Sequence, residues 1–330
     1  MEIAPPAAAR GKAADAAPVR VGVSACLMGE AVRFDGGHKR NDFLADALGN
    51  FVEFVPVCPE VEIGLGVPRA TLRLVREKSE TRLLANDTGA DHTQAMLRFA
   101  ERRAVALARE DLSGYVLKKD SPSCGMERVR VYGADGILWR DGRGLFARVL
   151  LARYPNLPVE EEGRLKDPQL RENFIERVFA YRRLTLFFRS RWTRGELAAF
   201  HAAHKLQLMA HAPSVCSELG RTVAGSPELA RREMRERYES AFMRALKIPA
   251  TRARHANVLQ HTVGYLRDRM DYASRGELLG LIEDYRRGLV PLIVPITLVR
   301  HYARFFDISY LNGQHYLEPH PKELMLRNHV

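Results

Sequence analysis

Short apolar runs alternate with helix-like patterns through the first half of the chain. The apolar runs are rich in Val and bounded by Gly, Pro or Ser, as buried strands are, and the segments between them repeat apolar residues at helical spacing. Strands that alternate with helices are typical of a parallel sheet flanked by helices, so we predict an α/β domain. The predicted strands are residues 19–25 (VRVGVSA), 51–57 (FVEFVPV) and 114–117 (GYVL), and the predicted helices are residues 42–48, 93–109 and 144–153.

Two further pairs of short apolar runs predict hairpins. Residues 72–75 and 82–85 flank the charged turn REKSE, and residues 129–132 and 137–139 flank a Gly-bounded turn. The segment that follows, residues 155–168 (PNLPVEEEGRLKDP), is rich in Pro and charge. We interpret it as the connection between two domains.

The second half of the chain has few strand signals and long helical patterns instead. Capping boxes predict helix starts at Thr193 with Glu196 and at Ser274 with Glu277, and the sequence Ser-Pro-Glu at 226–228 predicts another. This half is therefore expected to be an all-α domain. The predicted helices are residues 168–190, 194–211, 227–246, 252–272, 275–288 and 292–306.

The predicted domain organisation has three parts. Residues 1–18, rich in Ala and Pro, are expected to be a disordered tail; residues 19–165 form the α/β domain and residues 166–330 the all-α domain. The tail lacks the apolar core of a signal peptide, and no stretch reaches the ~20 apolar residues of a membrane helix. We therefore expect no membrane contact and a cytoplasmic location.

Charge separates the two halves more sharply than hydrophobicity does. Residues 1–170 hold 25 basic and 24 acidic side chains, whereas residues 171–330 hold 26 basic and 16 acidic ones. The second half also has nine of the eleven His residues. An excess of positive charge of this size makes the all-α domain a candidate for binding a polyanion such as RNA.

Three cysteines follow the three predicted central strands. Cys26, Cys58 and Cys124 each come at or shortly after a strand end. Because the carboxyl ends of parallel strands line one crevice, we expect these thiols to converge on one site. The alternative is that each is a small buried hydrophobe, which is our interpretation of Cys216.

Three thiolates with an open fourth position suit a soft metal centre, either zinc or an iron–sulfur cluster. Polar groups accompany them: Glu60 follows Cys58, and Ser121 precedes Cys124. A carboxylate beside a metal-held substrate suits a general base, and a hydroxyl suits water orientation or oxyanion stabilisation. The alternatives are a salt-bridged surface carboxylate for Glu60 and a turn residue for Ser121.

Three segments resemble the signatures of the thiouracil desulfidase family. They are VGVSACLMGEAVRFDGGHKR, PVCPEVEIGLGVPR and LKKDSPSCG, in the family's order. The resemblance implies a Rossmann-like domain in which Cys26, Cys58 and Cys124 hold a 4Fe–4S cluster, with the fourth iron open to a thiocarbonyl sulfur. The segments FHAAHKLQLMAHAP and QHYLEPHP resemble the helical domain often fused to it. Such fusions imply removal of sulfur from 4-thiouridine in transfer RNA.

The same resemblance implies roles for individual residues. We assign Glu60 and Ser121 as the catalytic pair, with Glu62 and Ser123 as rival assignments. Ser24, Asp35 and Ser123 are assigned to binding the thiolated uracil. In the expected reaction Glu60 deprotonates a water that attacks the ring carbon, sulfide leaves, and no net electron transfer is required.

The all-α domain is expected to contact RNA phosphates through its Arg-rich segments, residues 182–194 and 231–237. The aromatic residues in the first of these segments are interpreted as core rather than as stacking platforms. The histidines of the 194–211 helix lack an acidic or Cys partner at metal-ligand spacing, so we interpret them as solvated or phosphate-facing. These side chains are Phe187, Phe188, Trp192, His201, His204 and His211.

Three other functions were weighed against this one. In the first alternative, the chain is an enzyme that acts on free thiouracil, and the helical domain only mediates association. In the second, it is a non-catalytic RNA-binding protein in which zinc or a cluster serves as a sensor. A radical enzyme is disfavoured, because such enzymes commonly take three Cys from one short run and here they are scattered.

Overall fold

The computed structural model describes residues 18–78, 80–133, 137–225 and 229–329. The chain divides into two compact units, Met1–Arg164 and Leu165–Val330, and each is described by itself. Residues 1–17 of the predicted tail lie outside the described residues, as does the predicted helix start at 226–228.

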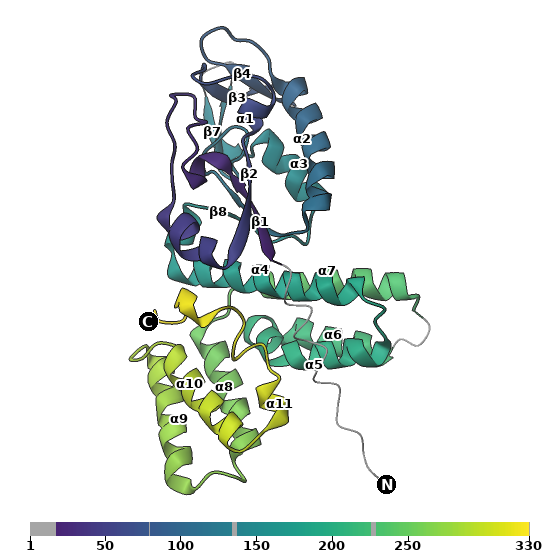
Figure 1. The fold of residues 1–330 in the computed structure, drawn as a ribbon, viewed down its shortest axis with the longest axis vertical. Coiled ribbons are helices and arrows are strands. Elements are labelled where there is room, and N and C mark those ends of the chain that lie inside the picture. The colour runs from purple at the N-terminus through teal and green to yellow at the C-terminus, as the bar shows by residue number, and fades with distance from the viewer. Residues whose placement is uncertain (1–17, 79, 134–136, 226–228, 330) are drawn as a thin grey trace. The chain divides into compact units, whose positions relative to one another are not determined.

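The core of the first unit is a sheet of four parallel strands (Figure 1). Their order is β2-β1-β5-β8, and the pairs β1–β2, β1–β5 and β5–β8 all run parallel, which confirms the α/β prediction. The edge strand β8 falls in the segment predicted to connect the domains, so that prediction was wrong there. The strands are β1 (Val19–Ser24), β2 (Val52–Val57), β5 (Leu112–Leu117) and β8 (Val159–Glu161).

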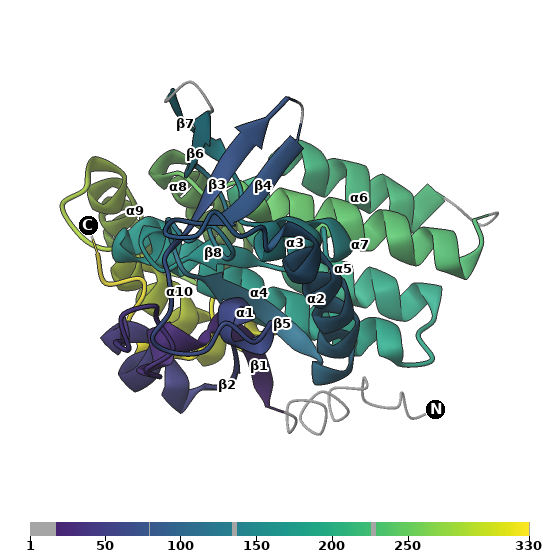
Figure 2. The ribbon, with the colours of Figure 1, turned by 90° about the horizontal axis from the view of Figure 1, so that it is seen from above.

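Two helices, α2 (Thr93–Leu107) and α3 (Leu145–Arg153), lie side by side next to this sheet (Figures 1 and 2). The ring of Phe146 on α3 lies 6.1 Å from that of Phe99 on α2 and 6.0 Å from that of Tyr115 on β5, so aromatic packing joins the helices to the sheet. The helix predicted at 42–48 is a short π-helical segment followed by a 3-10 turn, Phe43–Ala47 and Leu48–Asn50.

Both predicted hairpins are present and combine into a second sheet. Its order is β4-β3-β6-β7, with antiparallel pairs β3–β4 and β6–β7 joined by a parallel β3–β6 pair that the sequence did not predict. The β3–β6 pair joins segments that are more than 50 residues apart in the sequence. The strands are β3 (Leu72–Glu77), β4 (Glu80–Ala85), β6 (Val129–Gly133) and β7 (Leu138–Gly142).

The second unit is helical in its described residues, as predicted. Helix α6 (Pro213–Gly225) was not predicted, because it follows α5 with only Ala212 between them. The other helices are α4 (Pro168–Arg189), α5 (Arg194–His211), α7 (Arg231–Lys247), α8 (Arg252–Leu266), α9 (Tyr272–Arg287), α10 (Ile293–Phe305) and α11 (Ser309–Asn312).

One of the two predicted capping boxes is confirmed. The Thr193 hydroxyl accepts a hydrogen bond from the backbone N–H of Glu196, and the Glu196 carboxylate accepts one from the N–H of Thr193. The other prediction was wrong: α9 begins three residues earlier, and the carboxylate of Asp271 accepts the hydrogen bond from the N–H of Ser274. Ser and Asp are comparable caps, and the pattern alone does not rank them.

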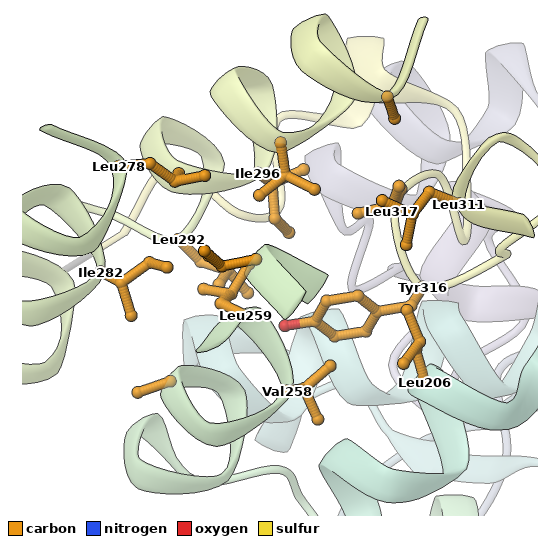
Figure 3. Packing of buried hydrophobic residues seen from close by; sticks show 14 of the residues in the cluster. Leu206, Val258, Leu259, Leu278, Ile282, Leu292, Ile296, Leu311, Tyr316 and Leu317 are labelled. Atoms are coloured by element: carbon orange, nitrogen blue, oxygen red, sulfur yellow. The ribbon is translucent and has the colours of Figure 1, made fainter. Parts of the chain in front are cut away.

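Buried apolar side chains form two clusters in the second unit. Figure 3 shows the first, where Leu206, Val258 and Leu259 lie around Tyr316 and Ile296 belongs to the same cluster. The second contains Phe188 and Trp192, and Phe187 packs against it, which confirms these aromatic residues as core. Among the described residues no helix is both long and apolar enough to cross a membrane.

Candidate metal centre and active site

The three predicted thiols lie at one edge of the parallel sheet. Cys26 lies in the 3-10 turn Ala25–Met28 directly after β1, Cys58 precedes the short helix α1 (Pro59–Glu62) directly after β2, and Cys124 lies within the loop that follows β5. Since β2, β1 and β5 are neighbours and parallel, their carboxyl ends coincide. All three cysteines line a single cavity of about 410 Å³.

Burial controls the ionisation of these thiols. It raises the pKa of Cys26 to about 11 and that of Cys58 to about 12, and it raises the pKa of Cys124 well above its ordinary value. The carboxylate of Glu60 adds to the shift at each of the three. A bare thiol site here holds protons at neutral pH, and a soft metal centre would displace them on binding.

The loop after β5 is built around the hydroxyl of Ser121. Its Oγ accepts hydrogen bonds from the backbone N–H groups of Ser123 (3.2 Å) and Cys124 (3.0 Å), which fixes the direction of the Cys124 side chain. Gly125 completes the turn, because a Cβ there would lie 2.8 Å from the carbonyl oxygen of Ser121. The residues SPSCG thus specify a tight loop that presents a thiol.

The carboxylate of Glu60 contacts both the thiol of Cys58 and the hydroxyl of Ser121. Its Oε1 lies 3.5 Å from Ser121 Oγ and its Oε2 lies 3.6 Å from Cys58 Sγ. All three residues line the cavity. A carboxylate, a hydroxyl and the thiols therefore surround one space large enough for a nucleobase.

The remaining candidate residues lie in different places. Ser24 lines the cavity and accepts a hydrogen bond from the N–H of Lys118 (2.9 Å). Ser123 is fully buried and is not among the cavity-lining residues. Asp35 lies on an exposed turn, where it accepts a hydrogen bond from Gly37 N–H (3.1 Å), and Glu62 pairs with Arg103 (3.5 Å); neither lines the cavity.

Basic side chains also line this cavity. Lys118, Arg33 and Arg69 all line it. Lys118 forms an ion pair with Glu162, and Arg33 lies 3.5 Å from Asp35. The available signal was positional, since these residues lie within the same signature segments as the cysteines. They give the cavity a positive rim suited to an anionic substrate.

The three thiols are soft donors of the kind that hold zinc or an iron–sulfur cluster. Across the described ranges, no three His, Cys, Asp or Glu side chains are grouped to hold one metal ion. Thiolates that hold a cluster bind different irons, so they lie apart around it, as thiols on three strand ends do. Cys26, Cys58 and Cys124 are the residues that would hold such a cluster.

Two of the three histidines of α5 contradict the prediction, whereas His201 is only partly buried and its Nδ1 lies 3.2 Å from the Tyr238 hydroxyl. His204 is fully buried and His211 is 2% exposed, so they are neither solvated nor phosphate-facing. His204 stacks on Phe200, with ring centroids 4.1 Å apart, and His211 lies 3.4 Å from Glu176 on α4. The acidic partner that sequence spacing did not show comes from another helix. Cys216 is buried in α6, with its sulfur 3.8 Å from the carbonyl oxygen of Lys205.

The basic segment 231–237 is largely neutralised within its own helix. Arg232 pairs with Glu236, Arg237 with Glu233, and Arg235 with Glu239, all at i,i+4 spacing. In the other Arg-rich segment, Arg182 is buried. The charge available to a polyanion is therefore smaller than the residue count indicates.

The fold and site together define an α/β domain with a thiol-lined crevice at its strand ends, followed by a helical domain. Residues 21–162 match the family model described as 2-thiouracil desulfurase, and residues 205–321 match one described as a protein of unknown function, DUF1722. The chain therefore belongs to the 2-thiouracil desulfurase family through its first unit, and its second unit carries the helical domain of YbgA-like proteins.

Individual proteins are similar to parts of the chain. The chain is 33% identical to the uncharacterized protein YbgA of Escherichia coli over 158 residues, which is 48% of this chain and 94% of that one. It is 29% identical to the uncharacterized protein YbbK of Bacillus subtilis over 109 residues, 31% of this chain and 71% of that one. A solved structure titled [4Fe-4S]-dependent thiouracil desulfidase TudS is 32% identical, with a TM-score of 0.37, over 45% of this chain and 93% of that one.

Proposed function

We propose that this chain replaces the sulfur of a thiolated uracil with oxygen, and that its substrate is 4-thiouridine in transfer RNA. The observation that carries the proposal is the cavity in which Cys26, Cys58 and Cys124 lie beside Glu60 and Ser121. The match of residues 21–162 to the 2-thiouracil desulfurase model supports the reaction class.

The cofactor in this proposal is a 4Fe–4S cluster held by the three thiolates. When bound, such a cluster would supply Lewis-acid activation of the carbon–sulfur bond of the thiocarbonyl. The family match and the soft, separated thiol donors support it.

Glu60 is the general base of the proposed reaction. Its carboxylate takes one proton from a water, whose oxygen attacks the ring carbon, and the sulfur departs as hydrosulfide. Ring, water and products balance without any oxidant or reductant: a thiocarbonyl and water give a carbonyl and hydrogen sulfide. The Ser121 hydroxyl, 3.5 Å from Glu60, orients the carboxylate and the incoming water.

The second unit supplies the affinity for RNA in this proposal. Its 26 basic against 16 acidic residues over positions 171–330 favour phosphate binding, although the i,i+4 pairs on α7 reduce that excess locally. A modified base inside folded RNA must be displaced to reach a cavity of about 410 Å³.

The test is turnover under anaerobic conditions with the cluster reconstituted in the full chain. We expect loss of thiocarbonyl absorbance and release of one sulfide per uridine formed from transfer RNA containing 4-thiouridine. Between 50 and 200 mM salt, kcat/KM on the RNA should fall by about tenfold or more, whereas kcat/KM on free thiouracil should stay constant.

Each result discriminates between functions. Turnover of free thiouracil without turnover of RNA would assign the helical domain to association instead. No sulfide release from either substrate would contradict the enzyme and favour a metal-dependent RNA-binding protein.

A further inference from the structure

The second sheet of the first unit, whose four strands lie side by side in Figure 2, has one buried side and one exposed side. Successive residues of a strand point to opposite sides of a sheet. Leu74 is paired in register with Leu83 on β4 and with Val131 on β6, and all three are fully buried. This side therefore belongs to the core, and the residues between them along each strand lie on the other side.

Three arginines from three neighbouring strands lie on that exposed side. They are Arg73 on β3, Arg130 on β6 and Arg140 on β7, and each of them is exposed. In the part of the chain that the structure describes, no ion pair joins any of the three to a carboxylate. Their charge is therefore available to an anionic partner.

The carboxylates on the same side gather at the turn between β3 and β4. Glu77 and Glu80 are paired in register there, and Glu77 forms an ion pair with Arg82 (2.7 Å). Arg82 also pairs with Asp91 (2.6 Å). Since Arg73 lies at the start of β3 and the other two arginines on β6 and β7, the acidic groups of this sheet do not neutralise the three.

An aromatic ring and an apolar side chain lie between these arginines. Tyr132 is paired in register with Val75 and Leu138, which places all three on the exposed side, and the Arg73 guanidinium lies 6.0 Å from the centre of the Tyr132 ring. Leu138 is 46% exposed. Guanidinium groups bind phosphates, and rings at a surface stack on bases. A sheet face that combines the two favours a nucleic acid strand as its partner.

This face begins at the edge of the thiol-lined cavity. Thr71 and Leu72 line the cavity, and Arg73 is the next residue along the chain. Cys124 lines it as well, and its loop leads directly into β6, which begins at Val129. A strand of RNA that places its modified base in the cavity therefore meets this sheet with its neighbouring nucleotides.

We propose that the exposed side of this sheet binds the nucleotides that flank the thiolated base in RNA. Arg73, Arg130 and Arg140 donate hydrogen bonds to phosphates, and the Tyr132 ring stacks on a base. The inference rests on the proposed RNA substrate, and it adds a contact surface in the first unit to the basic residues of the second.

The test is the affinity of the full chain, with its cluster reconstituted anaerobically, for fluorescein-labelled transfer RNA that lacks thiouridine and so is not turned over. Fluorescence anisotropy gives Kd at several salt concentrations. The triple variant Arg73→Gln, Arg130→Gln, Arg140→Gln should bind about tenfold or more weakly at ~100 mM salt. The slope of log Kd against log salt should fall by about 2 to 3, because each guanidinium removed is one phosphate contact fewer.

Two further variants separate contact from net charge. Arg98, Arg102 and Arg109 are exposed on α2 and the turn that follows it, and replacing all three by Gln changes the net charge of the same unit equally. This control should keep Kd within about twofold, because salt screens charges away from the contact. Tyr132→Leu keeps an apolar side chain and should weaken binding about fivefold or more without changing the salt slope, since it removes a stacking surface but no charge.

Far-UV circular dichroism checks that each variant is folded, and single Arg→Gln variants, each lowering the salt slope by about 1, replace a triple variant that is not. Equal Kd values for the sheet variant and the unsubstituted chain would overturn the surface. An equal loss of affinity in both triple variants would also overturn it, because the effect would then come from net charge.

Two more outcomes separate this inference from its alternatives. Poly-L-glutamate stands for an acidic protein: if it binds as tightly as RNA and loses affinity in the sheet variant alone, the face belongs to such a partner and the proposal fails. A chain that binds no transfer RNA would overturn both this surface and the RNA substrate. Sulfide release from free thiouracil would then decide separately whether the desulfuration stands.

Discussion

The two units place chemical groups by different physical rules. In the first, Cys26, Cys58 and Cys124 come from three neighbouring parallel strands, and chain direction alone brings them to the same edge. In the second, Glu176, His211 and Arg327 come from segments up to 151 positions apart, and only helix packing brings them together. A site at the edge of a parallel sheet can therefore be predicted from the sequence, because each of its residues follows a recognisable strand. A site formed by the packing of helices cannot be predicted in this way.

The largest effect expected at the sheet-edge site follows from losing one thiol. Cys26→Ser, Cys58→Ser or Cys124→Ser should each abolish both the brown colour of the cluster and sulfide release, because a serine hydroxyl is a poor ligand for a soft metal. Visible absorbance and turnover on the same anaerobic sample measure both properties.

Cys216→Ser is the matched control, since this thiol is buried in α6 of the other unit. It should keep the absorbance and the activity of the unsubstituted chain. A colourless variant lacking all three strand-end thiols that still released sulfide would refute the metal centre.

The next effect separates two carboxylates that are two residues apart. Glu60 lines the cavity beside Ser121 and Cys58, whereas Glu62 pairs with Arg103 outside it. Glu60→Gln should keep the absorbance of the cluster and lower kcat by ~10²–10⁴-fold, the usual contribution of a general base. Glu62→Gln should lower kcat by less than about threefold. The reverse pattern would move the base to Glu62.

The sequence predicted the parallel sheet and the places of its thiols because both depend on short-range pattern. Strand composition locates β1, β2 and β5, and each cysteine is adjacent to a strand end or in the loop after it. Strand β8 was missed because two of its three residues (VEE) are Glu, yet Glu160 and Glu161 are buried there. Each carboxylate has a specific partner, Arg164 for Glu160 and the N–H of Met126 for Glu161.

The burial of the α5 histidines could not be predicted for a related reason. His204 and His211 carry polar rings on a helix that also bears Lys205, and they were expected to face solvent or phosphate because no acidic or Cys partner stands at metal-ligand spacing. Their partners Phe200, Ile248 and Glu176 satisfy them only after folding. Polar residues buried by long-range packing leave no periodic signal in the sequence.

The smallest effect concerns the ion pair between His211 and Glu176, which also lies near Glu172, Arg327 and His255. Burial alone would lower the pKa of His211, but the negative charge of Glu176 outweighs it and raises that pKa above 6.5. Burial alone would raise the pKa of Glu176, but the neighbouring His211 outweighs it and lowers that pKa. The His211 contribution to the free energy of unfolding is therefore complete below pH 6.5 and lost as pH rises through the folded-state pKa. The Glu176 contribution is present above pH 4.5 and lost in more acidic solution.

Substituting His211→Gln should lower the free energy of unfolding of the second unit by about 3 kcal/mol near pH 6, because it leaves a buried carboxylate without its cation. The difference from the unsubstituted chain should shrink as the pH rises above 6.5 and through the folded-state pKa of His211, because the native imidazolium then also loses its proton. Urea unfolding measures this when Trp192, buried in the second unit, is the reporter and Trp139→Phe removes the other indole. A destabilisation that stayed constant across this pH range would mean that His211 stabilises the bundle by packing and not by charge. The polar groups of the second unit would then be held in place by helix packing without help from ion pairing.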